Sequence, residues 1–340
     1  MPLLTRRQTL AFALASALPW SQPARAAAPA PSAVKVTMAL DWTPNTNHIG
    51  LYVAQAKGFY GDAGLDVEIL PYTDTDATTL VANGVADFGI SSSIGLFMQR
   101  AGGAPVKGVY AVLETESGRL VFNDSRKDIQ RPRDLDGKTY GGFGGAWENA
   151  LIAAIIKNDG GEGKFETVTL GTSAYEALAN GSVDFTMEVY TWEGIEAELE
   201  KKALRRFRYS DYGVPDEQTT FIVASDSFLG HGSDIGKAFV QATRRGYDYC
   251  VDHPDEAAGL LISGSGGALT NEALVKASLK ALIDGHYLKT ADGRSGMVDP
   301  AKAQAIGNFL FKNGVLLDAQ GVALKAEPDF AGYYTNALFG

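Results

Sequence analysis

The chain has 340 residues, 45% of them hydrophobic, and a formal net charge of −10. This acidic balance disfavours nucleic acid and anionic lipid as partners. The single cysteine, Cys250, excludes an intrachain disulfide and a cysteine-based metal cluster, and the four histidines are scattered along the chain. We therefore expect neither a metal site nor a cofactor.

The N-terminal segment has the order of an export signal. Arg6 and Arg7 precede an apolar run over residues 10–18, and a small-residue cleavage site follows at residues 24–26. The apolar run is too short to span a membrane. The arginine pair is also typical of a twin-arginine signal, the alternative being a general secretory signal in which the two arginines only supply charge. We predict a signal peptide over residues 1–26 and an exported, periplasmic, monomeric protein.

A weak internal duplication organises the mature chain. An Asn-Gly-x-x-Asp-Phe element occurs twice, starting at Asn83 and at Asn180, and similar elements precede each copy. Strands alternating with helices predict an α/β protein with parallel sheets, one in each of two lobes. The first copy comprises a strand over 36–40, helices over 50–60 and 78–82, and a strand over 88–90; the second comprises a strand over 138–140, helices over 147–157 and 175–179, and a strand over 185–187.

Two further strand-like segments, 109–123 and 218–224, are predicted to cross between the lobes. A pair of crossings forms a hinge that can close on a solute. The C-terminal third contains predicted helices over 235–251, 255–261, 271–283 and 300–313, and it completes lobe one. The expected boundaries are residues 34–117 and 221–340 for lobe one and residues 118–220 for lobe two.

Ligands of open α/β sheets bind beyond the carboxyl ends of the strands. Four loops have this position, at residues 41–48, 91–93, 141–147 and 188–193, and they come in pairs from the two copies. The predicted site is therefore the cleft between the lobes.

The first loop offers four candidate ligand-binding residues. Trp42 follows a strand, and we expect it to stack on a planar heteroaromatic ring, the alternative being a core aromatic that packs against the first helix. Asn45 and Asn47 can hydrogen-bond ring nitrogens or an amino group, or cap the following helix. His48 can contact the ligand or be satisfied at the helix start.

The next two loops offer hydroxyl and backbone groups. Ser91, Ser92 and Ser93 end a strand and can direct their hydroxyls into the cleft. Gly142 and Gly144 belong to a run with four glycines in five positions before a helix, so backbone N–H groups there could bind a ligand oxygen. A tight strand-to-helix turn is the alternative interpretation of this run.

The last loop offers a carboxylate and two aromatic rings. Strand alternation predicts that Glu188, Tyr190 and Trp192 share the cleft face and that Glu193 faces solvent. The Glu188 carboxylate could accept from an exocyclic amine and would disfavour an anionic ligand. Tyr190 or Trp192 would form the second wall of an aromatic sandwich.

Residues 40–52 resemble the opening motif of ThiY, the pyrimidine-precursor binding proteins of thiamin salvage. This family belongs to a superfamily with the fungal thiamin pyrimidine synthase and the alkanesulfonate and nitrate binding proteins. Matching segments also occur at residues 56–60, 64–67, 87–90, 137–142 and 192–198. The resemblance implies a type II periplasmic-binding-protein fold, an ABC transporter permease at the inner membrane as partner, and a formylated aminomethyl-methylpyrimidine as solute.

The resemblance leaves an enzyme and other solutes as alternatives. The fungal synthase carries a lysine and a histidine shortly after the strand that corresponds to residues 88–90, and also a cysteine-rich iron motif. Residues 91–95 contain neither residue, and Cys250 stands alone, so we expect a binding protein and not an enzyme. Riboflavin, another heteroaromatic compound or a sulfonate remains an alternative solute.

Overall fold

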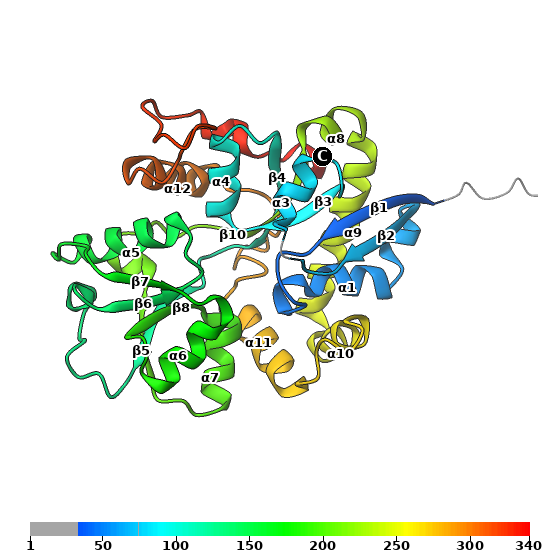
Figure 1. Cartoon of the computed structure of the whole chain (residues 1–340). Helices are drawn as coiled ribbons and strands as arrows, with labels where there is room; N and C mark the ends of the chain where they lie inside the picture. The colour runs from blue at the N-terminus through cyan, green and yellow to red at the C-terminus, as the bar shows by residue number, and fades with distance from the viewer. Residues whose placement is uncertain (1–32, 74) are drawn as a thin grey trace, which may run out of the picture. The chain divides into compact units, whose positions relative to one another are not determined.

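The computed structural model describes residues 33–73 and 75–340, so the predicted signal peptide lies outside the described residues. The described chain is built on two five-stranded sheets, which Figure 1 shows with helices packed around each of them. We call the first sheet with its helices lobe one and the second lobe two.

Both sheets have the same strand order. Lobe one has the order β2-β1-β3-β10-β4, and lobe two has the order β7-β6-β8-β5-β9. In each sheet the first three strands are parallel, and the fourth, β10 or β5, is antiparallel to its neighbours. The sheets are therefore mixed and not purely parallel as expected, because each one receives a strand that has just crossed from the other lobe. The strands are β1 (Val34–Ala39), β2 (Leu65–Leu70), β3 (Phe88–Ser91), β4 (Val106–Leu113), β5 (Gly118–Asn123), β6 (Thr139–Gly142), β7 (Glu166–Thr169), β8 (Phe185–Val189), β9 (Leu204–Arg208) and β10 (Thr219–Ser225).

The helices follow the predicted segments closely, with one break. The helix expected over residues 50–60 is divided into α1 and α2, because Gly58 has a left-handed φ of 73° that an α-helix cannot contain. Pro254 opens α10, where its missing N–H costs no helical hydrogen bond. The helices are α1 (Ile49–Ala56), α2 (Phe59–Asp62), α3 (Ala77–Ala82), α4 (Ser93–Ala101), α5 (Ala146–Asn158), α6 (Ala174–Asn180), α7 (Ile195–Leu199), α8 (Asp226–His231), α9 (Ser233–Asp252), α10 (Pro254–Gly264), α11 (Glu272–Asp284) and α12 (Pro300–Lys312).

The repeated Asn-Gly-x-x-Asp-Phe element makes the same connection in both lobes. Asp87 Oδ2 accepts a hydrogen bond of 2.8 Å from the Thr37 N–H, and Asp184 Oδ2 accepts one of 2.8 Å from the Thr139 N–H. In each case the carboxylate ties the turn after a helix to the neighbouring parallel strand, β1 in lobe one and β6 in lobe two. The repeat is therefore structural, and it places the two loop sets at corresponding edges.

Helices α1 and α9 approach each other closely in lobe one. A Cβ added to Gly246 would overlap the carbonyl oxygen of Gly50, and the ring of Tyr247 covers Gly50. The core beside this contact contains Phe88 stacked on Phe239, with ring centroids 4.0 Å apart. This packing holds α1, which starts directly after the first cleft loop.

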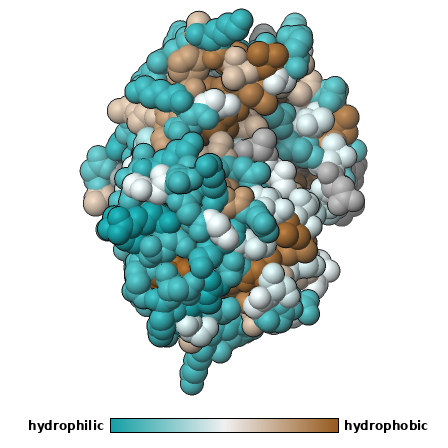
Figure 2. Space-filling view, turned by 60° about the vertical axis from the view of Figure 1, so that its left-hand side comes forward, coloured by the Kyte–Doolittle hydropathy of each residue, from teal (hydrophilic) through white to brown (hydrophobic). Residues whose placement is uncertain are grey.

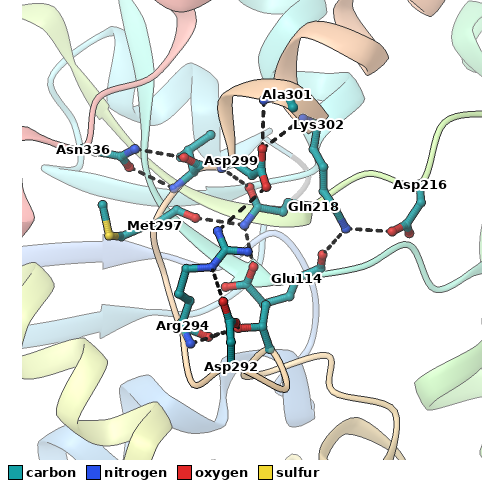
Figure 3. A network of polar contacts seen from close by, with 12 residues as sticks. Glu114, Asp216, Gln218, Asp292, Arg294, Met297, Asp299, Ala301, Lys302 and Asn336 are labelled. Atoms are coloured by element: carbon teal, nitrogen blue, oxygen red, sulfur yellow. Dashed lines mark hydrogen bonds and ion pairs between the residues drawn. The ribbon is translucent and has the colours of Figure 1, made fainter.

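The two crossings between the sheets are fastened together by the C-terminal region. Lys302 Nζ donates to Glu114 O and Asp216 Oδ2, both at 2.7 Å, so one side chain of α12 contacts both crossings. Gln218 Nε2 donates to Glu114 Oε2 at 2.7 Å and to Met297 O at 2.9 Å (Figure 3). We call Glu114, Asp216, Gln218 and Lys302 the hinge clamp.

The face of the molecule in Figure 2 is mainly hydrophilic in its lower part, and hydrophobic residues form patches toward its top and its right-hand side. Among residues 33–73 and 75–340, no helix is both long and apolar enough to cross a membrane.

Candidate functional site

A cavity of about 290 Å³ lies between the two lobes. The loops after β1 and β3 line it from lobe one, and the loops after β6 and β8 line it from lobe two. Both crossings also contribute residues. A larger groove of about 590 Å³ lies at the β2 edge of lobe one, but it receives no residue from lobe two. The cavity between the lobes is therefore the candidate site.

Aromatic rings form much of the cavity wall. Trp42, Trp147 and Trp192 all line it, together with Phe143. The Trp42 ring lies edge-on to Phe143 of lobe two, with centroids 5.9 Å apart, and 5.4 Å from Tyr72 of lobe one. Trp42 therefore contacts aromatic rings of both lobes.

The polar residues next to Trp42 include one that caps a turn and two with buried polar atoms that lack hydrogen-bond partners among the described residues. Asn45 caps the short turn that follows, because its Oδ1 accepts from the Asn47 N–H at 2.9 Å. His48 Nε2 is 2.9 Å from Asp41 Oδ1. The Asn47 Oδ1 and His48 Nδ1 atoms are buried and have no hydrogen-bond partner among the described residues. All four of these side chains line the cavity.

The serines after β3 have different roles. Ser92 caps α4 by accepting from the Gly95 N–H at 2.9 Å, and it lines the cavity. Ser91 donates to the Ser92 carbonyl and is not among the lining residues. Ser93 lines the cavity, and its buried Oγ has no hydrogen-bond partner in the described chain.

The glycine-rich loop does not offer the free N–H groups expected. Glu148, in the first turn of α5, accepts from the N–H groups of Phe143 at 3.1 Å, Gly144 at 2.9 Å and Gly145 at 3.2 Å. Gly142 and Gly144 do not line the cavity. The expectation that these glycines bind a ligand oxygen is corrected accordingly, since a carboxylate of the protein already occupies the position.

The loop after β8 departs from strand alternation. The strand ends at Val189, and residues 190–194 form a turn of π-helix, so alternation does not extend to Tyr190 and Trp192. Trp192 lines the cavity, but Tyr190 does not, and its ring lies 5.7 Å from the Arg206 guanidinium. Glu193, expected to face solvent, also lines the cavity, and burial raises its pKa to about 7.

Glu188 lies in the cavity wall as expected, but it is not free. Its Oε1 accepts from Arg206 Nε, and the residue is only 4% exposed. Burial raises its pKa, while the charge of Arg206 opposes that shift. The negative charge of Glu188 is therefore largely compensated inside lobe two.

Two carboxyl groups on the crossings, which the sequence did not predict as site residues, also line the cavity. Glu116 accepts from the Gly118 N–H and lies 3.3 Å from Arg119 Nη1, and burial raises its pKa to about 7. Glu217 is 4% exposed, its Oε2 has no hydrogen-bond partner within residues 33–73 and 75–340, and burial raises its pKa to about 8. The Ser93 hydroxyl is close enough to Glu217 to lower that pKa in part. In the sequence both crossings resemble simple connections between the lobes. The concentration of acidic residues in them is the signal that could have indicated a part of the binding site.

The lining residues give the site an unusual charge balance. They include six carboxylates and neither lysine nor arginine: Asp41, Glu116, Glu148, Glu188, Glu193 and Glu217. Such a cavity can hold a flat ring against indole faces and pair with hydrogen-bond donors or a positive charge on the ligand. In the described part of the chain, no group of three or more histidine, cysteine, aspartate or glutamate side chains is arranged to hold a metal ion.

Helix α11 also contacts both lobes beside the cavity. Ser278, fully buried on α11, donates to the carbonyl of Thr191 in lobe two and lies 2.5 Å from Thr46 Oγ1 in lobe one. One hydroxyl therefore bridges the cleft loops of both lobes. We call it the Ser278 bridge.

Comparisons with known proteins agree with this architecture. The NMT1/THI5-like family model matches residues 45–257, more than half of the chain. A formylaminopyrimidine-binding protein of Halalkalibacterium halodurans is 28% identical over 233 residues, covering 67% of this chain and 70% of that protein. A 4-amino-5-hydroxymethyl-2-methylpyrimidine phosphate synthase of Candida albicans is 25% identical over 235 residues, covering 66% of this chain and 69% of that protein.

A solved structure shares the fold over nearly the whole chain. The alkanesulfonate-binding protein SsuA from Xanthomonas axonopodis pv. citri, bound to MOPS, superimposes with a TM-score of 0.65 at 15% sequence identity. The match covers 90% of this chain and 99% of that one. The protein therefore has the periplasmic-binding-protein fold, and its chain belongs to the NMT1/THI5-like family.

Proposed function

We propose that the protein is the solute-binding component of an ABC importer and that its solute is an aminopyrimidine precursor of thiamin, of the formylated aminomethyl-methylpyrimidine type. The observation that carries the proposal is the cavity between the lobes, with three tryptophans in its wall and a Glu217 carboxyl oxygen, Oε2, that has no hydrogen-bond partner among the described residues. Family membership and the name of the Halalkalibacterium halodurans relative support the same solute class.

The aromatic wall and the volume favour a single flat ring. Trp42 can stack on a pyrimidine, and such stacking contributes roughly 1–3 kcal/mol per base in nucleic-acid complexes. A cavity of about 290 Å³ is at the small end of ligand pockets. It suits a one-ring solute better than the three-ring system of riboflavin, our alternative.

The polar groups favour a ligand rich in hydrogen-bond donors. Glu217 is the carboxyl group best placed to accept from an exocyclic amine, since Glu188, our first choice from the sequence, is already paired with Arg206. The Asn47 and Ser93 side chains add further buried polar atoms that lack partners among the described residues. This pattern argues against a sulfonate, which would meet six carboxylates and no lining cation.

A binding role is favoured over a synthase role, although synthases occur among the similar proteins. The segment after β3 carries serines in place of the lysine and histidine that the resemblance would require. Cys250 lies buried on α9, where it donates to the Gly246 carbonyl and burial raises its pKa, so it is a structural thiol. We infer that the chain binds its pyrimidine without converting it.

Location and partner follow from the same proposal. The predicted signal peptide would deliver the protein to the periplasm, by the twin-arginine or the general route, and the partner is an inner-membrane permease. N-terminal sequencing of the periplasmic protein should start near Ala27. Recovery of an intact Met1 terminus from the cytosol would contradict the transport role.

The solute itself is tested directly. Mass spectrometry of gently purified protein should detect a retained pyrimidine, and calorimetry should show binding of 4-amino-5-hydroxymethyl-2-methylpyrimidine or its formylaminomethyl analogue. Riboflavin and an alkanesulfonate serve as comparison ligands. Tighter binding of either comparison ligand than of both pyrimidines would refute the assignment of the solute.

A further inference from the structure

The start of α5 has the geometry of an anion site. The loop after β6 turns at Gly144, whose φ of 82° is left-handed, and this conformation aims three consecutive N–H groups at one point. The positive end of the α5 macrodipole adds to their field, and α5 is long enough, at 13 residues, to have a developed dipole. Phosphate, sulfate and carboxylate groups bind at such positions in proteins generally.

In this chain the anion at that point is part of the protein. The Glu148 carboxylate accepts from the N–H groups of Phe143, Gly144 and Gly145, and the residue is 1% exposed. Glu148 also lines the cavity between the lobes, together with its neighbours Phe143 and Trp147. The start of α5 therefore borders the cavity, and the position where an anion would bind is occupied by the Glu148 carboxylate.

We propose that Glu148 is an internal counter-anion that makes the cleft select uncharged or cationic ring solutes and exclude phosphorylated or sulfonated ones. The proposal rests on the function proposed above only for the identity of the ring. Two effects act together. The carboxylate removes three hydrogen-bond donors from reach, and its charge repels a phosphate, which carries about −1.5 to −2 charges at neutral pH. No lysine or arginine lines the cavity to offer an anion a partner in place of the occupied N–H groups.

The test creates the anion site by substitution. Glu148→Ala frees the three N–H groups, so sulfate should raise the melting temperature of this variant with a saturable dependence at constant ionic strength. In the wild type, sulfate should give only the general, non-saturating stabilisation of a salt that is excluded from protein surfaces. The matched control is Glu176→Ala, which removes an exposed first-turn glutamate of α6 that does not line the cavity. It should behave as the wild type.

A second arm uses the ring solute. The wild type should bind 4-amino-5-hydroxymethyl-2-methylpyrimidine at least about tenfold more tightly than its phosphate ester, a difference of roughly 1.4 kcal/mol. Glu148→Ala should reduce or reverse this ratio. Glu148→Gln keeps the acceptor oxygen and the cap while removing the charge, so it should reduce the ratio even if the alanine variant folds poorly.

The outcomes separate the two proposals. A wild type that binds no pyrimidine at all refutes the solute assignment, while the sulfate arm still decides the role of Glu148. If Glu148→Ala folds but sulfate stabilises it no more than Glu176→Ala, the anion site does not exist. Equal affinity of the wild type for the free pyrimidine and its phosphate would refute the selection directly.

Discussion

The buried carboxyl group of Glu217 predicts a stability that depends on pH even without ligand. Burial raises its pKa from the ordinary value of 4.5 to about 8 in the folded protein, so the folded state holds a proton that the unfolded state releases above pH 4.5. The contribution of the protonated Glu217 carboxyl group to the free energy of unfolding is fully present below pH 4.5, and it is lost as the pH rises to 8. Replacement by glutamine, which is similar in shape and always neutral, removes this loss.

The size of the effect follows from the shift. A pKa difference of about 3.5 units at about 1.4 kcal/mol per unit corresponds to roughly 5 kcal/mol as an upper bound, and relaxation around the ionised group will reduce it. We therefore expect the free energy of unfolding of Glu217→Gln, relative to the wild type, to increase by about 3–5 kcal/mol between pH 4.5 and pH 9.

Urea unfolding at pH 4.5, 6, 7.5 and 9 provides the measurement. Glu116 and Glu193, whose pKa values are both raised to about 7, titrate in the same range, but they are present in both proteins and cancel to first order in the difference. Glu166→Gln on the exposed strand β7 is the matched surface control. A stability difference between Glu217→Gln and the wild type that stays constant across this range would show that Glu217 is not held in an environment that resists ionisation.

Three other substitutions test the cleft and its support. Trp42→Ala should weaken pyrimidine binding by roughly 1–3 kcal/mol through loss of stacking, as calorimetry would show, and unchanged affinity would remove Trp42 from the site. Ser278→Ala breaks the Ser278 bridge and leaves the Thr191 carbonyl without its donor, so it should lower ligand affinity by about 1–2 kcal/mol. An unaltered dissociation constant would mean that the bridge does not favour the closed lobes. Gly246→Ala should destabilise the fold by about 1–3 kcal/mol in urea, because the added methyl overlaps Gly50. A gain in stability, as alanine gives in an isolated helix, would contradict that close contact.

The local pattern of the sequence predicted the elements well where the interactions are local. The repeated Asn-Gly-x-x-Asp-Phe element marked a helix end and a strand start, and both copies make the same bond through Asp87 and Asp184. The break at Gly58 was not predictable from pattern alone, because an isolated glycine is tolerated within helices. The short turn of π-helix after Val189 likewise leaves no period that separates it from a continuing strand.

The site was harder to predict, because its chemistry depends on residues distant in the sequence. The pairing of Glu188 with Arg206 joins two strands that flank β5, and Glu217 meets Ser93 only after the chain has returned from lobe two. The contact of Glu148 with the glycine-rich loop was different, since a glutamate three residues after the helix cap is a recognised capping pattern. That spacing could have shown that the loop's N–H groups were already taken.

The distribution of tryptophan gives the protein an optical property. Of its four tryptophans, Trp20 lies in the predicted signal peptide, and Trp42, Trp147 and Trp192 all line the cavity. The tryptophan emission of the mature chain, excited selectively at wavelengths that tyrosine does not absorb, would then originate from indoles at the cleft, with no background from tryptophans elsewhere in the fold. Quenching or a wavelength shift on mixing with a solute would report events at that one place, without a dye or an engineered label.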